Sequence, residues 1–399
     1  MKKKISLLLS VIIGFTLCAP AFAADTYSSQ FTDISASSWY APYVETACES
    51  GLMNGVGGAS FNPNGNLTVS SAITLAARLH NIYHGNSVDL KNGDPWYQPY
   101  VDYASKNGIL DPAQSYDYGS NITRADFALL ISNALPDSAL PAINDIQPGD
   151  VPGVSSGSPM DDARNALVNA GVVKPGDSYM ILLMSGAISG QGTNDAVGAA
   201  VYRLYRAGVL TGNDAYGTFA PDTDIQRSEV AAIISRVVDA SQRRRIQLEQ
   251  KPANLVPMDN LANRSSLQKK ASDAELAQAY EEARKIVEPL ANLSVEAQLY
   301  GIALAVRVIT ENEVEYSMSA PHYNDPYGFF ILHTASCAGC TRTTGLCLNM
   351  LGISYEHVNE GQYSHQWTRV NVNGTYWICD AYGLYCGPEP APYQHPTLS

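Results

Sequence analysis

One stretch of sequence occurs twice at an offset of 57 residues and a third time in weaker form. The first copy, SSWYAPYVETACESGLMNG, begins at Ser37, and the second, DPWYQPYVDYASKNGILDP, begins at Asp94. The third copy, GAAVYRLYRAGVLTG, spans Gly198–Gly212. Each copy ends in glycine followed by apolar residues, which is typical of a helix with a glycine stop. A repeat of this length predicts units that stack on one another and share a core.

A short loop and a second helix are predicted after each copy. The second helices begin within the segments NLTVSSAITLAARL, NITRADFALLISNAL and DIQRSEVAAIISRVV. Two of these segments have a polar residue and a carboxylate where a helix cap and a first-turn acid belong. These pairs are Thr123 with Asp126, and Gln226 with Glu229. The N-terminal two thirds of the chain is therefore predicted to be all-α.

These repeats resemble S-layer homology (SLH) domains. The segments ITRAD (Ile122–Asp126) and IQRSE (Ile225–Glu229) match that family's Thr-Arg-Ala-Glu motif, and FTDISASSWY (Phe31–Tyr40) matches its opening. The resemblance covers roughly residues 30–240. It implies a pseudo-threefold helical bundle whose grooves bind a secondary cell-wall polysaccharide on a Gram-positive-type envelope. By family position, the glycan-binding residues would be Arg124, Arg227, Trp39, Trp96 and Asp33.

The chain departs from the SLH pattern in two places. Val69 stands at the motif's arginine position in the first repeat, which weakens the expectation of a binding groove there. The third repeat is stretched between Ile143 and Gly198, and within this insertion DARNALVNAGVV (Asp162–Val173) is predicted to be a half-repeat helix. The apolar segment YMILLM (Tyr179–Met184) is left unassigned. For both arginines an ion pair at a helix start, and for both tryptophans core packing, are the alternative interpretations.

The remaining boundaries follow from composition. The opening MKKKISLLLSVIIGFTLCAPAFAAD has lysines, a short apolar run and small residues, which predicts a secretory signal peptide cut after Ala23. The aperiodic, polar stretch 241–272 is predicted to be a linker, with the preceding helix extending through Arg243–Arg245. The predicted order is signal peptide 1–23, SLH repeats 30–85, 86–140 and 141–240 with an insertion, linker 241–272, and a C-terminal domain 273–399.

The charge and hydropathy of the chain exclude some functions. The formal charge is −13, which disfavours nucleic acid as a partner because that binding depends on Lys and Arg. No stretch of the mature sequence is long and apolar enough for a membrane span. The predicted signal peptide indicates a secreted protein, the SLH resemblance implies a location at the cell wall, and export makes disulfides possible.

The C-terminal domain places three cysteines close together. The segment HTASCAGCTRTTGLCLNMLGI predicts a helix that begins near Cys337 and stops at Gly352. A thiol at a helix N-terminus lies at the positive end of the helix dipole, which favours the thiolate. Cys337 is therefore a candidate nucleophile, whereas Cys340 and Cys347 lie further along the helix.

A predicted hairpin supplies a base and an acid for this thiol. The segment SHQWTRVNVNGTYWICDAYG alternates around Asn373-Gly374, a strong signal for a two-residue turn. That turn pairs Val372 with Thr375, so His365 and Asp380 become diagonal neighbours on one face of the sheet. A carboxylate that orients an imidazole is what a cysteine nucleophile needs for its base.

Cysteine at a helix start, then His-x-Trp, then Trp-x-x-Asp, resembles the transglutaminase-like superfamily. The matching residues are ASCAG, HQW and WICD, within about residues 273–399. The resemblance implies an α+β, papain-like fold in which Cys337 is the nucleophile, His365 the general base and then acid, and Asp380 the orienting group. Ala335, Cys340 and Thr341 depart from the family pattern beside the nucleophile.

Other fates of the cysteines remain open. Cys337 and Cys340 have the spacing of a redox pair, zinc has possible ligands among the cysteines and His365, and Cys340, Cys347, Cys379 and Cys386 have possible disulfide pairings. We expect a multidomain, wall-anchored cysteine hydrolase or acyltransferase that acts on an extracellular peptide or protein, without metal or cofactor. The alternative is a non-catalytic envelope-binding scaffold with a degenerate, disulfide-stapled C-terminal domain.

Overall fold

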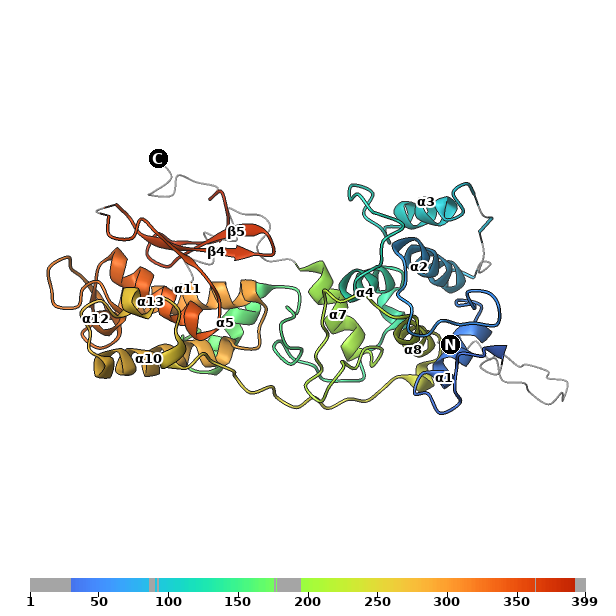
Figure 1. Cartoon of the computed structure of the whole chain (residues 1–399), viewed down its shortest axis with the longest axis horizontal. Coiled ribbons are helices and arrows are strands. Elements are labelled where there is room, and N and C mark those ends of the chain that lie inside the picture. The colour runs from blue at the N-terminus through green and yellow to red at the C-terminus, as the bar shows by residue number, and fades with distance from the viewer. Residues whose placement is uncertain are drawn as a thin grey trace, which may run out of the picture.

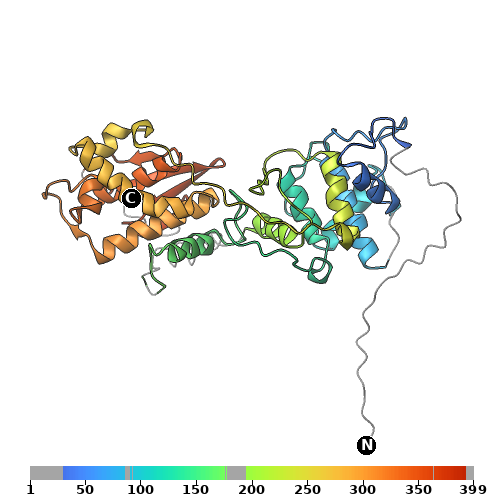
Figure 2. The same cartoon turned by 90° about the horizontal axis from the view of Figure 1, so that it is seen from below.

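The computed structural model describes residues 30–85, 90–91, 93–175, 177, 195–362 and 364–391. The predicted signal peptide and the segment Tyr179–Met184 lie outside these residues. The chain forms two lobes, each with its own hydrophobic core (Figures 1 and 2). Within the described residues, no helix combines the length and apolar character that crossing a bilayer requires.

The first lobe consists of helices in pairs. Its helices are α1 (Ala41–Glu49), α2 (Val69–Tyr83), α3 (Gln98–Lys106), α4 (Arg124–Asn133), α7 (Ala196–Arg206) and α8 (Arg227–Val238). The predicted caps are present: the Thr123 side chain accepts a hydrogen bond from the N–H of Asp126, and Gln226 and Glu229 form a capping box. Each cap satisfies N–H groups that would otherwise lack partners at the helix start.

A closed ring of backbone hydrogen bonds joins the three repeats. Just before α2, the N–H of Leu67 donates to the carbonyl of Ile225 at 3.0 Å. The N–H of Ile225 donates to Ile122 at 3.1 Å, and the N–H of Ile122 donates back to Leu67 at 2.9 Å. The three equivalent positions therefore contact one another in cyclic order, which relates the repeats by approximate threefold symmetry.

The second lobe has helices packed on a small sheet. Its helices are α5 (Pro159–Asn169), α9 (Arg264–Gln268), α10 (Asp273–Val287), α11 (Val295–Asn312), α12 (Pro326–Phe330) and α13 (Cys337–Met350). Its strands are β1 (Glu315–Tyr316), β2 (Thr334–Ala335), β3 (Glu356–Val358), β4 (Trp367–Val372), β5 (Thr375–Asp380) and β6 (Tyr385–Pro388). β3 to β6 form an antiparallel sheet in chain order, and β1 pairs with β2 in parallel. The sheet lies against α11 and α13 (Figure 1).

The predicted hairpin register is confirmed. Val372 pairs with Thr375, and Thr368 with Cys379, around a turn in which Asn373 and Gly374 both have positive φ. Positive φ at both central residues is what a tight hairpin turn of this kind requires. The register places Asp380 at the end of β5, beside the start of β4.

The structure differs from the predicted boundaries at the insertion. The helix predicted as a half-repeat is α5, and it packs on α11 in the second lobe (Figures 1 and 2). Met160, Ala163 and Leu167 form its buried stripe in the second core. The physical reason lies in α11, which is buried around most of its circumference and needs a cover on the side that the sheet and α13 leave open.

The predicted linker also differs from expectation. The helix predicted to extend through Arg243–Arg245 is α8, which ends at Val238. Further along, the segment packs on both cores, with Ile246 on the first and Leu267 on the second. Residues 241–272 therefore connect the lobes as ordered chain.

Candidate active site

Cys337 is the first residue of α13, as the sequence predicted. Ser336 precedes it in extended conformation, and its N–H donates to the carbonyl of Tyr323 at 2.7 Å. No side chain caps this helix and its first turn has no acidic residue. The positive end of the helix dipole therefore faces the thiol without a competing anion.

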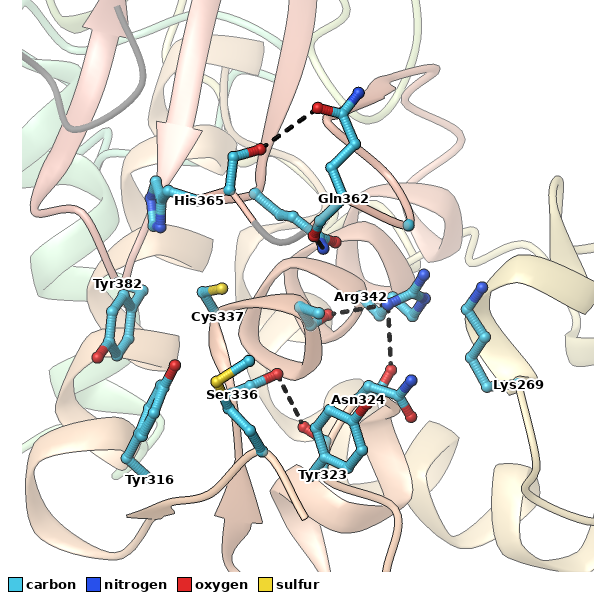
Figure 3. A pocket seen from close by; sticks show the side chains of 15 residues that line it. Lys269, Tyr316, Tyr323, Asn324, Ser336, Cys337, Arg342, Gln362, His365 and Tyr382 are labelled. Carbon is cyan, nitrogen blue, oxygen red and sulfur yellow. Dashed lines mark hydrogen bonds between the residues drawn. The ribbon is translucent and has the colours of Figure 1, made fainter. Parts of the chain in front are cut away.

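His365 and Asp380 meet as the hairpin register predicted. Nε2 of His365 lies 2.5 Å from Oδ2 of Asp380, and the other carboxylate oxygen accepts the N–H of Gly383 at 2.8 Å. Asp380 is buried, which keeps water away from this contact. Because Nε2 is engaged by Asp380, Nδ1 is the imidazole nitrogen left to meet Cys337. Figure 3 shows His365 above the Cys337 sulfur at the cavity wall.

The pKa values of Cys337 and His365 are shifted in the directions that favour an ion pair between them. Burial opposes the thiolate of Cys337, but hydrogen bonds from His365 and from the backbone N–H groups of Gln366 and Ala338 outweigh it, so the pKa is lowered. Burial likewise opposes the imidazolium, but Asp380 and Cys337 raise the pKa of His365 to about 9. At neutral pH His365 therefore favours the imidazolium, and it lies beside a thiol whose ionisation it promotes.

The remaining cysteines of the described chain have a different environment. All six described cysteines are free thiols, and Cys337 is the one that is not buried. Burial raises the pKa of Cys340 to about 12 and raises those of Cys347 and Cys386 as well. Cys379 faces Cys386 across β5 and β6, away from His365. The described part of the chain holds no group of three His, Cys, Asp or Glu side chains placed to bind a metal ion.

Cys337 opens into a cavity of about 420 Å³. Tyr316 and Tyr382 form its wall on one side, with ring centroids 5.7 Å apart, and Tyr382 also contacts His365 (Figure 3). On the opposite side lie Lys269 and Arg342. The sequence analysis assigned none of these four to the site, although the predicted hairpin register places Tyr382 opposite His365 and Arg342 lies within the segment that begins with Cys337.

Thr341, which departs from the expected motif, bridges the two halves of the site. Its hydroxyl oxygen lies 2.8 Å from the carbonyl of Cys337 and 2.8 Å from the carbonyl of Gln366. The side chain is buried, so its O–H depends on these acceptors. Thr341 therefore ties the first turn of α13 to the segment that carries His365.

The first lobe has two cavities that match the predicted glycan-binding residues. Trp96 and Arg227 line one of about 270 Å³, and Trp39 and Arg124 line another of about 280 Å³. Both tryptophans are among the exposed large side chains. Asp33 does not line either cavity.

The arginines and Asp33 also have structural roles. Arg124 pairs with Glu229 and donates to the Phe219 carbonyl, whereas Arg227 donates to the carbonyls of Phe61 and Asn54. The carboxylate of Asp33 accepts hydrogen bonds from the 60–62 loop, from the Ser60 hydroxyl and from the N–H groups of Phe61 and Asn62. Asp33 therefore holds the 60–62 loop, and its charge acts on Arg227, which lines one of the two cavities. Its contact with a glycan stays a prediction.

The chain has recognisable relatives in its repeat region. The family model of the S-layer homology domain matches residues 30–68. The chain is 26% identical over 127 residues to a surface-layer 125 kDa protein of Lysinibacillus sphaericus. It is 30% identical over 125 residues to an amylopullulanase of Thermoanaerobacterium thermosulfurigenes, and 27% identical over 125 residues to exoglucanase XynX of Acetivibrio thermocellus.

Each of these matches is partial. They cover 29% of this chain, and 11%, 7% and 11% of the three relatives in the same order. The similarity therefore concerns one module within proteins of different kinds. The chain carries an S-layer homology domain at residues 30–68 and is a protein of the cell wall surface.

Proposed function

We propose that the second lobe is a transglutaminase-like cysteine acyltransferase or peptidase that forms a thioester at Cys337. The observation that carries this proposal is the chain of contacts from Asp380 through His365 to a cysteine at a helix start, at the wall of an open cavity. In this proposal each residue has one role. Cys337 attacks, His365 transfers the proton, and Asp380 orients and charges the imidazole.

The reaction divides into two acyl transfers. The Cys337 thiolate adds to an amide carbonyl, and backbone N–H groups at the start of α13, including that of Cys337, stabilise the oxyanion. The His365 imidazolium gives its proton to the departing amine, which leaves a thioester and a neutral imidazole. The imidazole then takes a proton from the second acceptor as that acceptor attacks the thioester. Water as acceptor completes hydrolysis, whereas a lysine amine completes a cross-link.

The first lobe would hold this activity at the cell wall. S-layer homology domains bind cell-wall polysaccharide, and such a domain matches residues 30–68. In our proposal, the two cavities with Trp39 and Trp96 receive a secondary cell-wall polysaccharide. Guanidinium groups suit carboxylate-bearing glycans, since each offers a fork of N–H donors. The grooves would thus anchor the chain while the second lobe meets an extracellular peptide or protein.

Thiol labelling of the full chain tests the catalytic part of the proposal. The protein is incubated with iodoacetamide at neutral pH, and mass spectrometry follows each cysteine separately. We expect rapid labelling of Cys337 that falls at least about tenfold in His365→Ala and in Asp380→Ala. His333→Ala is the matched control, because His333 is an exposed histidine away from the cavity.

Two results would overturn the catalytic proposal. One is slow labelling spread over all cysteines and unaffected by the His365 and Asp380 changes. The other is a Cys337 locked in a disulfide in the protein recovered from its envelope. Either would favour the non-catalytic scaffold.

A further inference from the structure

The cavity at Cys337 has an unusual charge for this protein. The chain has 38 acidic and 25 basic residues, yet the described residues that line the cavity include no Asp or Glu. They include Lys269 and Arg342, together with His365, which favours the imidazolium at neutral pH. A lining with cationic side chains and no carboxylate favours anions over cations, so it helps to select among substrates.

Arg342 stabilises the cavity wall through hydrogen bonds within the protein. Its side chain is 2% exposed, and its guanidinium donates to the carbonyl oxygens of Ser266 and Asn324 and to Glu360 at 3.0 Å. Such a buried group, with hydrogen bonds from all three of its nitrogens, is poorly placed to turn toward a ligand. It contributes charge to the cavity without offering a direct contact.

Lys269 is placed differently. Its side chain is 31% exposed, and Nζ has one hydrogen bond, to Oε1 of Glu360 at 3.4 Å. That same oxygen accepts the shorter bond from Arg342. The Glu360 carboxylate is therefore shared by two cations, and Lys269 has the longer and weaker of the two contacts.

The backbone at Lys269 supports a role beyond stability. Lys269 has φ of 49° and ψ of −105° directly after α9, a conformation that is costly for a residue with a side chain. Residues held in such conformations concentrate at binding sites, where the surrounding structure maintains them. Here the conformation keeps the ammonium at the cavity wall, beside Arg342 and Asn324 (Figure 3).

We propose that the acyl-transfer site takes an anionic peptide, whose carboxylate pairs with Lys269 while its scissile amide lies at Cys337. This inference rests on the proposed function and names the substrate class. The cavity has a fixed polarity, with Tyr316 and Tyr382 at one end, Cys337 between, and Lys269 at the other (Figure 3). An amide flanked by an apolar or ring-bearing group on one side and a carboxylate on the other matches that order.

Three reagents of nearly equal size test this assignment on the full chain. They are N-iodoacetyl-Ala-Glu-amide, N-iodoacetyl-Ala-Gln-amide, and N-iodoacetyl-Ala-Gln with a free C-terminal carboxylate. Second-order rate constants for alkylation of Cys337 are measured by mass spectrometry at low and high salt. Comparison of the first reagent with the second isolates a side-chain carboxylate, and comparison of the third with the second isolates a terminal one.

We expect at least one anionic reagent to react on the order of fivefold faster than the neutral one, a preference that shrinks at high salt. Lys269→Met should abolish the preference, measured as the ratio of the anionic to the neutral rate constant within that variant, and Lys269→Arg should retain it. Lys270→Met is the matched control, because Lys270 is the exposed neighbour and does not line the cavity.

The outcomes separate the two proposals. Equal rates for all three reagents, or a preference that survives in Lys269→Met, would overturn the carboxylate subsite. Slow alkylation of Cys337 by every reagent, with a preference that still disappears in Lys269→Met, would keep the subsite and overturn the proposed acyl transfer.

Discussion

His365 and Asp380 are fifteen positions apart in the sequence, yet Nε2 of one lies 2.5 Å from Oδ2 of the other. The hairpin of β4 and β5 produces this contact, because its register brings the end of β5 beside the start of β4. The contact charges the imidazole that in turn favours the Cys337 thiolate. The chemistry proposed for this lobe therefore depends on a two-residue turn at Asn373-Gly374.

The first prediction concerns pH. The pKa of Cys337 is lowered and that of His365 is raised to about 9, and both shifts favour the thiolate–imidazolium pair. The rate of alkylation should rise with a midpoint below that of a free cysteine, about 8.5. His365→Ala removes the hydrogen bond and leaves the burial, so the midpoint should move upward. Acyl transfer should decline above about pH 9, where the general acid is lost.

The second prediction concerns Asp380. In Asp380→Asn the amide oxygen can still accept the N–H of Gly383, but the negative charge beside His365 is gone. Acyl transfer should fall by roughly a hundredfold or more, because the imidazolium loses its partner. Thermal unfolding, measured in parallel, should change little. A variant with full activity would show that the carboxylate has no catalytic role.

The third prediction concerns Thr341. Thr341→Val keeps the shape but leaves the Gln366 carbonyl without its donor, at a cost of about 1 kcal/mol. The backbone N–H of Gln366 helps to lower the pKa of Cys337, so this variant should raise the pH midpoint of alkylation. Thr341→Ser restores the hydroxyl and should restore the midpoint. An unchanged midpoint in both variants would limit Thr341 to packing.

The sequence alone predicts one part of this site and not the other. The turn at Asn373-Gly374 is encoded locally, and it fixes the register and hence the approach of His365 to Asp380. Cys337 is predicted as a candidate nucleophile because the sequence shows where its helix begins. Lys269 and Tyr316 line the cavity but come from separate segments of the chain, and no local sequence pattern indicates that they lie beside Cys337.

The fold, like the site, could be predicted from the sequence only in part. The repeats predict the pairs of helices in the first lobe, because the first helices end at glycine and the second helices α2, α4 and α8 begin at caps. The position of α5 could not be predicted from the repeats. Its stripe of Met160, Ala163 and Leu167 fits any apolar face. Which face α5 covers depends on the side of α11 that the sheet and α13 leave open.

The fourth prediction tests the place of α5. Leu167 is fully buried in the second core. Leu167→Ala should destabilise the second lobe by about 3 kcal/mol, as for a leucine removed from a packed core. Asn165→Ala, at an exposed position of the same helix, should have little effect. Limited proteolysis with peptide mapping would localise the change, and early cleavage confined to the first lobe would contradict the assignment.

The fifth prediction concerns the wall-binding cavities. Trp39 and Trp96 are 59% and 46% exposed, so replacing either by alanine should leave the unfolding temperature nearly unchanged. Each replacement should weaken binding to purified cell-wall polysaccharide by about tenfold, and the double variant by more. Tyr83→Ala is the control, because Tyr83 is a similarly exposed ring that lines neither cavity. Undiminished sedimentation of the double variant with cell walls would remove both cavities from the binding site.

The most direct test of the central claim is to trap the acyl group on Cys337. The full chain is mixed with p-nitrophenyl acetate, quenched after a short interval and analysed by mass spectrometry of its peptides. We predict one acetyl group on Cys337, which disappears with time as water or an added amine accepts it, and which is absent in His365→Ala. An unacetylated Cys337, or an acetyl group that persists equally in wild type and His365→Ala, would contradict the account.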